Sequence, residues 1–152
     1  MSGAMPDLDF EPLRGFWEGA AAGELRLPRC NGCGAWVWYP RPRCPACGGD
    51  APAWTATSGR GTLFSFAIVR RALWAPYASF VPYATGLVAL AEDPAVRIVT
   101  RLVHCDPDAL RVDQPVRAVF EPLAFPDDAR RCTAPFFTPS DDRAHSPTRD
   151  SP

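Results

Sequence analysis

Two Cys-x-x-Cys-Gly motifs constrain this chain more than any other feature. The first holds Cys30 and Cys33, the second holds Cys44 and Cys47, and ten residues separate Cys33 from Cys44. Four cysteines at this spacing can bind one metal ion tetrahedrally, and the metal then folds a segment too short to fold by itself. Because four protein sulfurs fill the coordination sphere, no position is left for water or substrate. The motifs therefore predict a structural metal site.

Zinc is the expected ion because the predicted role is structural. An iron site of the rubredoxin type uses the same four sulfurs and stays an alternative, as does a pair of redox-active Cys-x-x-Cys motifs. Gly34 and Gly48 each follow a motif and suit the tight turn in which backbone N–H groups face the sulfurs. In a reducing compartment this pattern favours thiolate ligation over disulfides.

Composition indicates a small globular protein. The chain has 152 residues, 47% of them hydrophobic, which is enough for one packed domain with an appendage. Neither a signal peptide nor a membrane-spanning stretch is evident, so a cytoplasmic protein is expected. A net charge of -1 argues against binding nucleic acid mainly through phosphate neutralisation. The sequence contains no Lys, which excludes Schiff-base chemistry and a phosphate-loop lysine.

The first 56 residues are expected to form a helical segment and then a metal-binding ribbon. Apolar residues at steps of three and four predict a helix within residues 10–27, and Gly23 is a plausible stop. Residues 24–27 alternate like a short strand. Between the cysteine motifs, residues 35–39 have the aromatic and β-branched content of a hairpin strand. The predicted boundaries are a helical segment at 1–27 and a zinc ribbon at 28–56.

The following part of the chain predicts a β-barrel, which makes the whole protein mainly β. Strands are expected at 62–69, 83–91, 96–103 and 116–120, with a fifth ending at Phe136 and Phe137. Phe64, Phe66 and Ile68 are expected on one face. The connections are too short for helical crossovers, so a five-stranded OB-fold barrel at 57–139 is the economical choice. Residues 140–152 are polar and are expected to be a disordered tail.

Candidate catalytic residues are few. Cys105 and Cys132 lie outside the metal motifs, and Cys105 stands between His104 and Asp106. Adjacent residues on a strand point to opposite faces, so His104 and Cys105 are not expected to form a base and its nucleophile. A small buried cysteine at a strand end is the simpler interpretation. We therefore predict that the chain is not itself an enzyme.

Residues 70–82 form a long segment, here called the aromatic loop, that is unusually rich in rings for a loop. Exposed rings flanked by arginines are typical of interfaces and ligand grooves. The alternative is that the rings fold back to close one end of the barrel. The arginines suit a phosphate or a partner's carboxylates. The candidate partner-contacting or CoA-contacting residues are Arg70, Arg71, Trp74, Tyr77 and Phe80.

Taken together, several motifs give the chain a family resemblance between Phe10 and about Pro139. They are Phe16-Trp17-Glu18, the two cysteine motifs with Pro40-Arg41-Pro42 between them, Trp54, Ser58-Gly59-Arg60-Gly61-Thr62, Cys105-Asp106-Pro107, Pro115-Val116 and Val119-Phe120-Glu121. In this order they resemble the zinc-ribbon OB-fold family known as domain of unknown function family 35. The resemblance implies a helical lead-in, a rubredoxin-like zinc ribbon and a C-terminal OB-fold.

The resemblance also implies a function. Members of this family are small non-catalytic partners of acyl-CoA enzymes, among them thiolases, thiolase-like aldolases of steroid or aromatic degradation, and MaoC-type enoyl-CoA hydratases. In some assemblies the subunit helps to shape the channel for the pantetheine arm of CoA. By this resemblance the chain is expected to bind structural zinc and to act as an accessory subunit in a hetero-oligomer.

Two other functions compete with this expectation. A single-stranded nucleic-acid-binding OB-fold protein is the main alternative, because rings on such barrels can stack bases. The charge balance disfavours it, since the acids equal or exceed the bases. A small independent enzyme using Cys105 is the third possibility, and it requires activity from the isolated chain.

Overall fold

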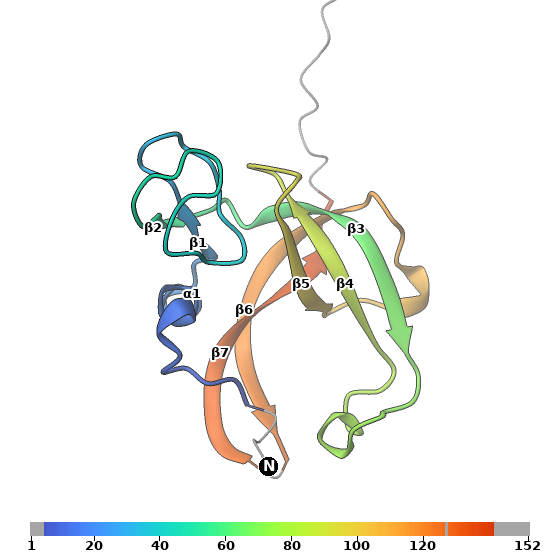
Figure 1. The fold of residues 1–152 in the computed structure, drawn as a ribbon. Helices are drawn as coiled ribbons and strands as arrows, with labels where there is room; N and C mark the ends of the chain where they lie inside the picture. The colour runs from blue at the N-terminus through green and yellow to red at the C-terminus, as the bar shows by residue number, and fades with distance from the viewer. Residues whose placement is uncertain (1–4, 127, 142–152) are drawn as a thin grey trace, which may run out of the picture.

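The computed structural model describes residues 5–126 and 128–141. Figure 1 shows a short helix and a small ribbon packed on one side of a β-barrel. Residues 142–152, most of the predicted tail, lie outside the described part of the chain. Within that part, no helix has the length and apolar character needed to cross a membrane.

The N-terminal helix lies where the apolar pattern predicted it, although its first turn is a 3-10 turn. A 3-10 turn, η1 (Glu11–Leu13), leads directly into α1 (Arg14–Ala21). The chain leaves the helix through Gly23, whose φ of 74° is a left-handed conformation that favours glycine. Gly15 lies so close to Trp54 that a Cβ atom would be 2.3 Å from its ring. Glycine therefore lets the helix seat against the ribbon.

The ribbon consists of β1 (Arg26–Arg29) and β2 (Ala53–Ala56), which pair antiparallel on either side of the cysteine loops. The hairpin strand predicted at residues 35–39 is wrong: this stretch makes only an isolated bridge from Trp36 to Arg29. Pro40 and Pro42 follow it and have no N–H to extend a ladder, which explains the absence of a strand.

A closed five-stranded barrel confirms the predicted OB-like fold. Its strand order is β3-β4-β5-β7-β6. The strands are β3 (Arg60–Val69), β4 (Tyr83–Leu90), β5 (Arg97–Leu102), β6 (Pro115–Phe125) and β7 (Asp128–Pro139). Two 3-10 turns lie in the connections, η2 (Ala75–Tyr77) between β3 and β4 and η3 (Pro107–Ala109) between β5 and β6. The barrel closes weakly between β5 and β7, which pair only at Leu102 and Phe137.

A β-bulge in β3 changes which residues face the core. The register with β4 shifts between Leu63 and Ser65, so Phe64 is the extra residue. As a result Leu63 is fully buried and Phe66 packs against the core, whereas Phe64 is exposed. The prediction that Phe64 shares a face with Phe66 and Ile68 is therefore wrong, because a one-residue bulge reverses the alternation of a strand.

One continuous core joins the ribbon to the barrel. Leu25 and Leu27 belong to the same buried cluster as Leu63, Val88 and Phe137 of the barrel. The partly buried rings of Phe16, Trp36 and Trp38 pack against this cluster. The ribbon is thus fixed to the barrel by shared hydrophobic burial, and it is not connected to the barrel only by the chain.

Candidate metal centre and partner surface

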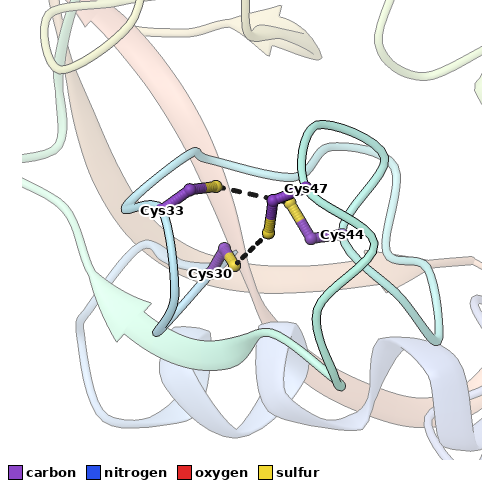
Figure 2. A group of neighbouring side chains, drawn as sticks. All are labelled: Cys30, Cys33, Cys44 and Cys47. Carbon is purple, nitrogen blue, oxygen red and sulfur yellow. Dashed lines mark hydrogen bonds between the residues drawn. The ribbon is translucent and has the colours of Figure 1, made fainter.

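The structure brings the four predicted metal ligands together. The Sγ atoms of Cys30, Cys33, Cys44 and Cys47 all lie within 4.8 Å of one another. The Cys30 and Cys47 sulfurs are 3.6 Å apart, and the Cys33 and Cys44 sulfurs are 3.7 Å apart (Figure 2). In each motif the first cysteine is buried and the second is exposed. The cluster is therefore half enclosed by the loops that build it.

Both cysteine loops use the same turn. The N–H of Gly34 donates to the carbonyl of Cys30 at 2.9 Å, and the N–H of Gly48 donates to the carbonyl of Cys44 at the same distance. Gly34 and Gly48 have φ values of 74° and 72°, which side chains other than glycine rarely adopt. The glycines that follow the two motifs are therefore needed to turn each pair of sulfurs towards the other.

The electrostatics of the cluster suit a cation. The backbone N–H groups of Cys33 and Gly32 lower the pKa of Cys30 to about 6. The N–H of Gly49 acts to lower the pKa of Cys47, but the neighbouring sulfurs outweigh it and raise this pKa to about 12. Four thiolates at such short separations repel one another, and a metal ion among them removes this penalty. These four cysteines are thus positioned to bind a metal.

The remaining cysteines lack the features of a nucleophile. Burial, followed by the charge of Asp106, raises the pKa of Cys105, and burial raises that of Cys132. Both residues therefore hold their thiol form more strongly than a free cysteine does. His104 makes its side-chain contact with Glu121 instead of Cys105. Among the described residues, no cysteine thus forms a side-chain contact with a histidine base.

The aromatic loop divides into an anchored part and an exposed part. The Tyr77 ring lies 5.3 Å from Phe125 and 6.0 Å from Tyr83, and the Phe80 ring lies 5.8 Å from Phe125. Trp74 packs on the outer side of Tyr77 and remains 47% exposed. Leu73 is 97% exposed. The loop therefore folds back onto the barrel through Tyr77 and Phe80 and presents Leu73 and Trp74 to the outside.

The two arginines of the loop differ. Arg70 forms an ion pair with Asp108, which lies in η3. Arg71 is exposed. Arg70 thus has a carboxylate neighbour within this chain, and its contact with a partner or with CoA stays a prediction.

Sequence reasoning missed Arg101 and the cavity beside it, which adjoin the aromatic loop. Arg101 lies with its guanidinium 4.4 Å from the Phe80 ring and 4.7 Å from the Phe136 ring, and burial lowers its pKa. Next to it is a cavity of about 370 Å³ whose lining includes Tyr77, Tyr83, Leu123 and Phe136. The signal that could have pointed to the cavity is the apolar Leu123, which lies beyond the predicted end of the strand at residue 120.

Comparison with known proteins identifies both halves of the chain. Residues 17–53 match the model described as "ChsH2, rubredoxin-like zinc ribbon domain". Residues 54–121 match that described as "ChsH2, C-terminal OB-fold domain". A solved structure titled "Ltp2-ChsH2(DUF35) aldolase" aligns with a TM-score of 0.72 over 91% of this chain and 98% of that one, at 27% identity. The chain belongs to the DUF35 family.

The curated relatives of this DUF35 chain include an enzyme subunit and a scaffold. The 3-oxo-4,17-pregnadiene-20-carboxyl-CoA hydratase alpha subunit of Mycobacterium tuberculosis is 36% identical over 116 residues, which are 74% of this chain and 34% of that protein. The DUF35 domain-containing scaffold protein of Methanothermobacter thermautotrophicus is 27% identical over 93 residues, covering 60% of this chain and 68% of that protein. The chain spans about a third of the length of the hydratase alpha subunits that it matches.

Proposed function

We propose that this DUF35 chain is a non-catalytic accessory subunit, held together by a structural zinc ion, that binds and stabilises an acyl-CoA-processing enzyme. The candidates for that enzyme are a thiolase, a thiolase-like aldolase and an enoyl-CoA hydratase. The observation that carries the proposal is the exposure of Leu73 and Trp74 on a loop that Tyr77 and Phe80 anchor to the barrel. Apolar side chains on a rigid support are what protein interfaces use as central contacts.

Zinc is supported by the chemistry of the donor set. Cys30, Cys33, Cys44 and Cys47 would hold the ion through four sulfurs, which is the usual ligand set of a structural zinc site. With every coordination position taken by protein, the ion would fix the cysteine loops relative to β1 and β2. It would offer no Lewis-acid position to a substrate, in keeping with an accessory role.

The acyl-CoA class of the partner is supported by the relatives. One is named a probable enoyl-CoA hydratase alpha subunit, another is named the alpha subunit of a steroid carboxyl-CoA hydratase, and the solved structure is named as an aldolase containing a DUF35 chain. One relative is named a scaffold protein, which agrees with a chain that supports another protein. The environment of Cys105 supports the same conclusion, because a partly buried thiol with a raised pKa is a poor nucleophile.

Contact with CoA is the finer part of the proposal. Arg70 is engaged by Asp108, so the exposed Arg71 is better placed to meet a phosphate. The rings of Tyr77 and Phe136 line the cavity beside Arg101 and would suit the apolar pantetheine arm. In this arrangement the chain would supply one wall of a channel and the enzyme would supply the reacting groups.

The test is to purify the tagged chain from the organism that encodes it, identify the co-eluting protein and assay acyl-CoA turnover. We expect an acyl-CoA enzyme to co-purify, the complex to turn over acyl-CoA and the isolated chain to be inactive. Turnover by the isolated chain that is lost in Cys105→Ala would overturn the non-catalytic role. Salt-sensitive binding of single-stranded nucleic acid, with no enzyme recovered, would favour the alternative function.

A further inference from the structure

Among residues 5–126 and 128–141, no strand pairs with one edge of β5 over most of its length. β4 pairs with β5 from Arg97 to Leu102 on one side, whereas β7 meets the other side only at Leu102. The carbonyl of Val96 accepts from Leu90 of β4, and the N–H of Val103 donates to Phe137 of β7. Because these directions alternate along a strand, the N–H groups of Arg97, Val99 and Arg101 point away from β4. An edge of this kind is a template for a further strand.

The side chains along this edge form a short polar and apolar pattern. Ile98, Thr100 and Leu102 are buried, so the alternate residues Arg97, Val99 and Arg101 face outward. Val99 is 74% exposed, although valine is usually buried. The outer face of the edge therefore presents one bare apolar side chain between two arginines.

Aromatic rings hold both arginines in place. The Arg97 guanidinium lies 3.6 Å from the centre of the Phe64 ring. Phe64 is the residue that the β3 bulge turns outward. Arg101 lies against Phe80 and Phe136. In the described part of the chain, no ion pair joins either Arg97 or Arg101 to a carboxylate. The rings thus hold two positive charges in position, and the charge of Glu121 acts on Arg101 without forming an ion pair with it.

A second copy of this chain is a poor occupant of the edge. If two β5 edges paired antiparallel around Val99, Arg97 of one copy would lie opposite Arg101 of the other. Like charges placed directly opposite each other across a sheet are destabilising. The charge pattern is instead complementary to a strand that has acidic residues opposite the two arginines and an apolar residue between them.

We propose that the free edge of β5 binds an extended segment of the partner protein by β-augmentation, with the side-chain pattern acidic, any, apolar, any, acidic. The segment would hydrogen-bond to the backbone of Arg97, Val99 and Arg101 and place its apolar residue beside Val99. Its acidic residues would pair with the two arginines. This inference rests on the proposed function for the identity of the partner, and the edge itself can be tested without it.

The first test uses the acetylated and amidated peptide Thr-Glu-Thr-Val-Thr-Glu-Thr and the full chain. The peptide is palindromic, so it can pair in either direction. We expect it to slow amide hydrogen exchange at Val99 and Arg101, and we expect no slowing with the same peptide carrying Lys in place of Glu. The Arg97→Glu variant should abolish this preference, because each peptide then makes one attractive and one repulsive pair with residues 97 and 101. Absence of protection of the wild type by the acidic peptide, equal protection of the wild type by both peptides, or an unchanged preference in Arg97→Glu would overturn the proposal.

A proline variant tests the backbone contribution. Val99→Pro removes an N–H that faces the free edge and leaves the bonds to β4, whereas Val99→Thr keeps the N–H and the branched side chain. We expect the acidic peptide to bind Val99→Pro about tenfold more weakly than Val99→Thr. Equal affinity would contradict backbone pairing, and Arg97→Glu remains the test if Val99→Pro fails to fold.

The co-purified complex separates this inference from the proposed function. If an acyl-CoA enzyme co-purifies equally well with Val99→Pro and Val99→Thr, the β5 edge is not where the partner binds and the proposed function stands. If the peptide binds as expected but no acyl-CoA enzyme co-purifies, the edge is a strand-binding site and the proposed function fails.

Discussion

The ring of Tyr77, in the loop between β3 and β4, lies 5.3 Å from the ring of Phe125 at the end of β6. Phe125 is 3% exposed and also contacts Phe80. Two connections of the barrel that are distant in sequence are thus joined through one buried ring. This contact fixes the base of the aromatic loop and leaves Leu73 and Trp74 at its exposed end.

Phe125→Ala should therefore destabilise the chain and release the loop. Removing a buried phenylalanine costs about 3 kcal/mol of unfolding free energy, and the loss should be accompanied by faster amide exchange at residues 75–80. Phe10→Ala is a matched control, because Phe10 is 46% exposed. Denaturant unfolding and hydrogen exchange measure the two effects. Unchanged exchange in the loop of Phe125→Ala would show that Tyr77 and Phe80 do not depend on this ring.

Loss of one metal ligand should unfold the cysteine loops. Cys44 is 2% exposed within the cluster, so Cys44→Ser should abolish metal retention and lower the melting temperature, because the ribbon shares its core with the barrel. Elemental analysis of the purified chain should find one zinc ion in the wild type. Cys132→Ser should keep that ion. Iron in the wild type would contradict the zinc assignment. Full metal content in Cys44→Ser would contradict the role of Cys44 as a ligand.

Two neighbouring glycines make a matched test of the cysteine turns. Gly34 has a φ of 74°, so Gly34→Ala should lower stability by about 1 kcal/mol and weaken metal binding. At Gly32 an added Cβ would lie 3.7 Å from the Cys30 sulfur, an ordinary contact, so Gly32→Ala should be nearly neutral. Competition with a chelator measures the metal affinity of each variant. Equal losses in both would mean that the positive φ of Gly34 is unimportant.

The ion pair at the start of β7 should give a pH-dependent contribution to stability. Arg130 binds Asp128 through two nitrogens, at 3.0 and 2.7 Å, and lowers the pKa of that carboxyl from 3.8 to about 2. A lowered carboxyl pKa stabilises the folded chain above pH 3.8, and this contribution is lost as the pH falls towards 2.

Asp128→Asn should therefore be less stable than the wild type at neutral pH and equal to it near pH 2. Urea unfolding at the two pH values measures this difference. Asp50→Asn, at an exposed position in the ribbon, serves as the control for charge removal alone. A destabilisation of Asp128→Asn that persists unchanged at the acidic end would assign the effect to packing instead of the ion pair.

The sequence predicted those features that depend on local pattern. The spacing of the four cysteines identified the cluster, and the glycines after each motif identified its turns. The alternation in residues 83–91 and 96–103 placed β4 and β5 to within a residue or so at each end. Such features are encoded by neighbours in the chain, so they can be recognised without tertiary structure.

The remaining features depend on contacts between distant segments. The bulge at Phe64 exists because β3 must follow the register of β4, and no residue near Phe64 signals it. Arg70 lies in a segment that was expected to bind an anion of a partner or ligand, but it forms an ion pair with Asp108 of η3. The predicted strand ended at residue 120, whereas β6 continues through Pro122 to Phe125, although proline within a run usually argues against a strand. Consequently Arg101 and the cavity beside it were not among the predicted contact residues.

The most direct test of the central claim is the dissociation constant between the co-purified acyl-CoA enzyme and variants of this chain. Leu73→Asp places a charge on the exposed end of the aromatic loop, and Val112→Asp makes the same change at a 52% exposed apolar residue between η3 and β6. If the loop carries the interface, Leu73→Asp should weaken binding at least tenfold, as expected for a central contact, and Val112→Asp should bind like the wild type. Equal affinity of all three proteins would contradict the claim that the aromatic loop binds the partner enzyme.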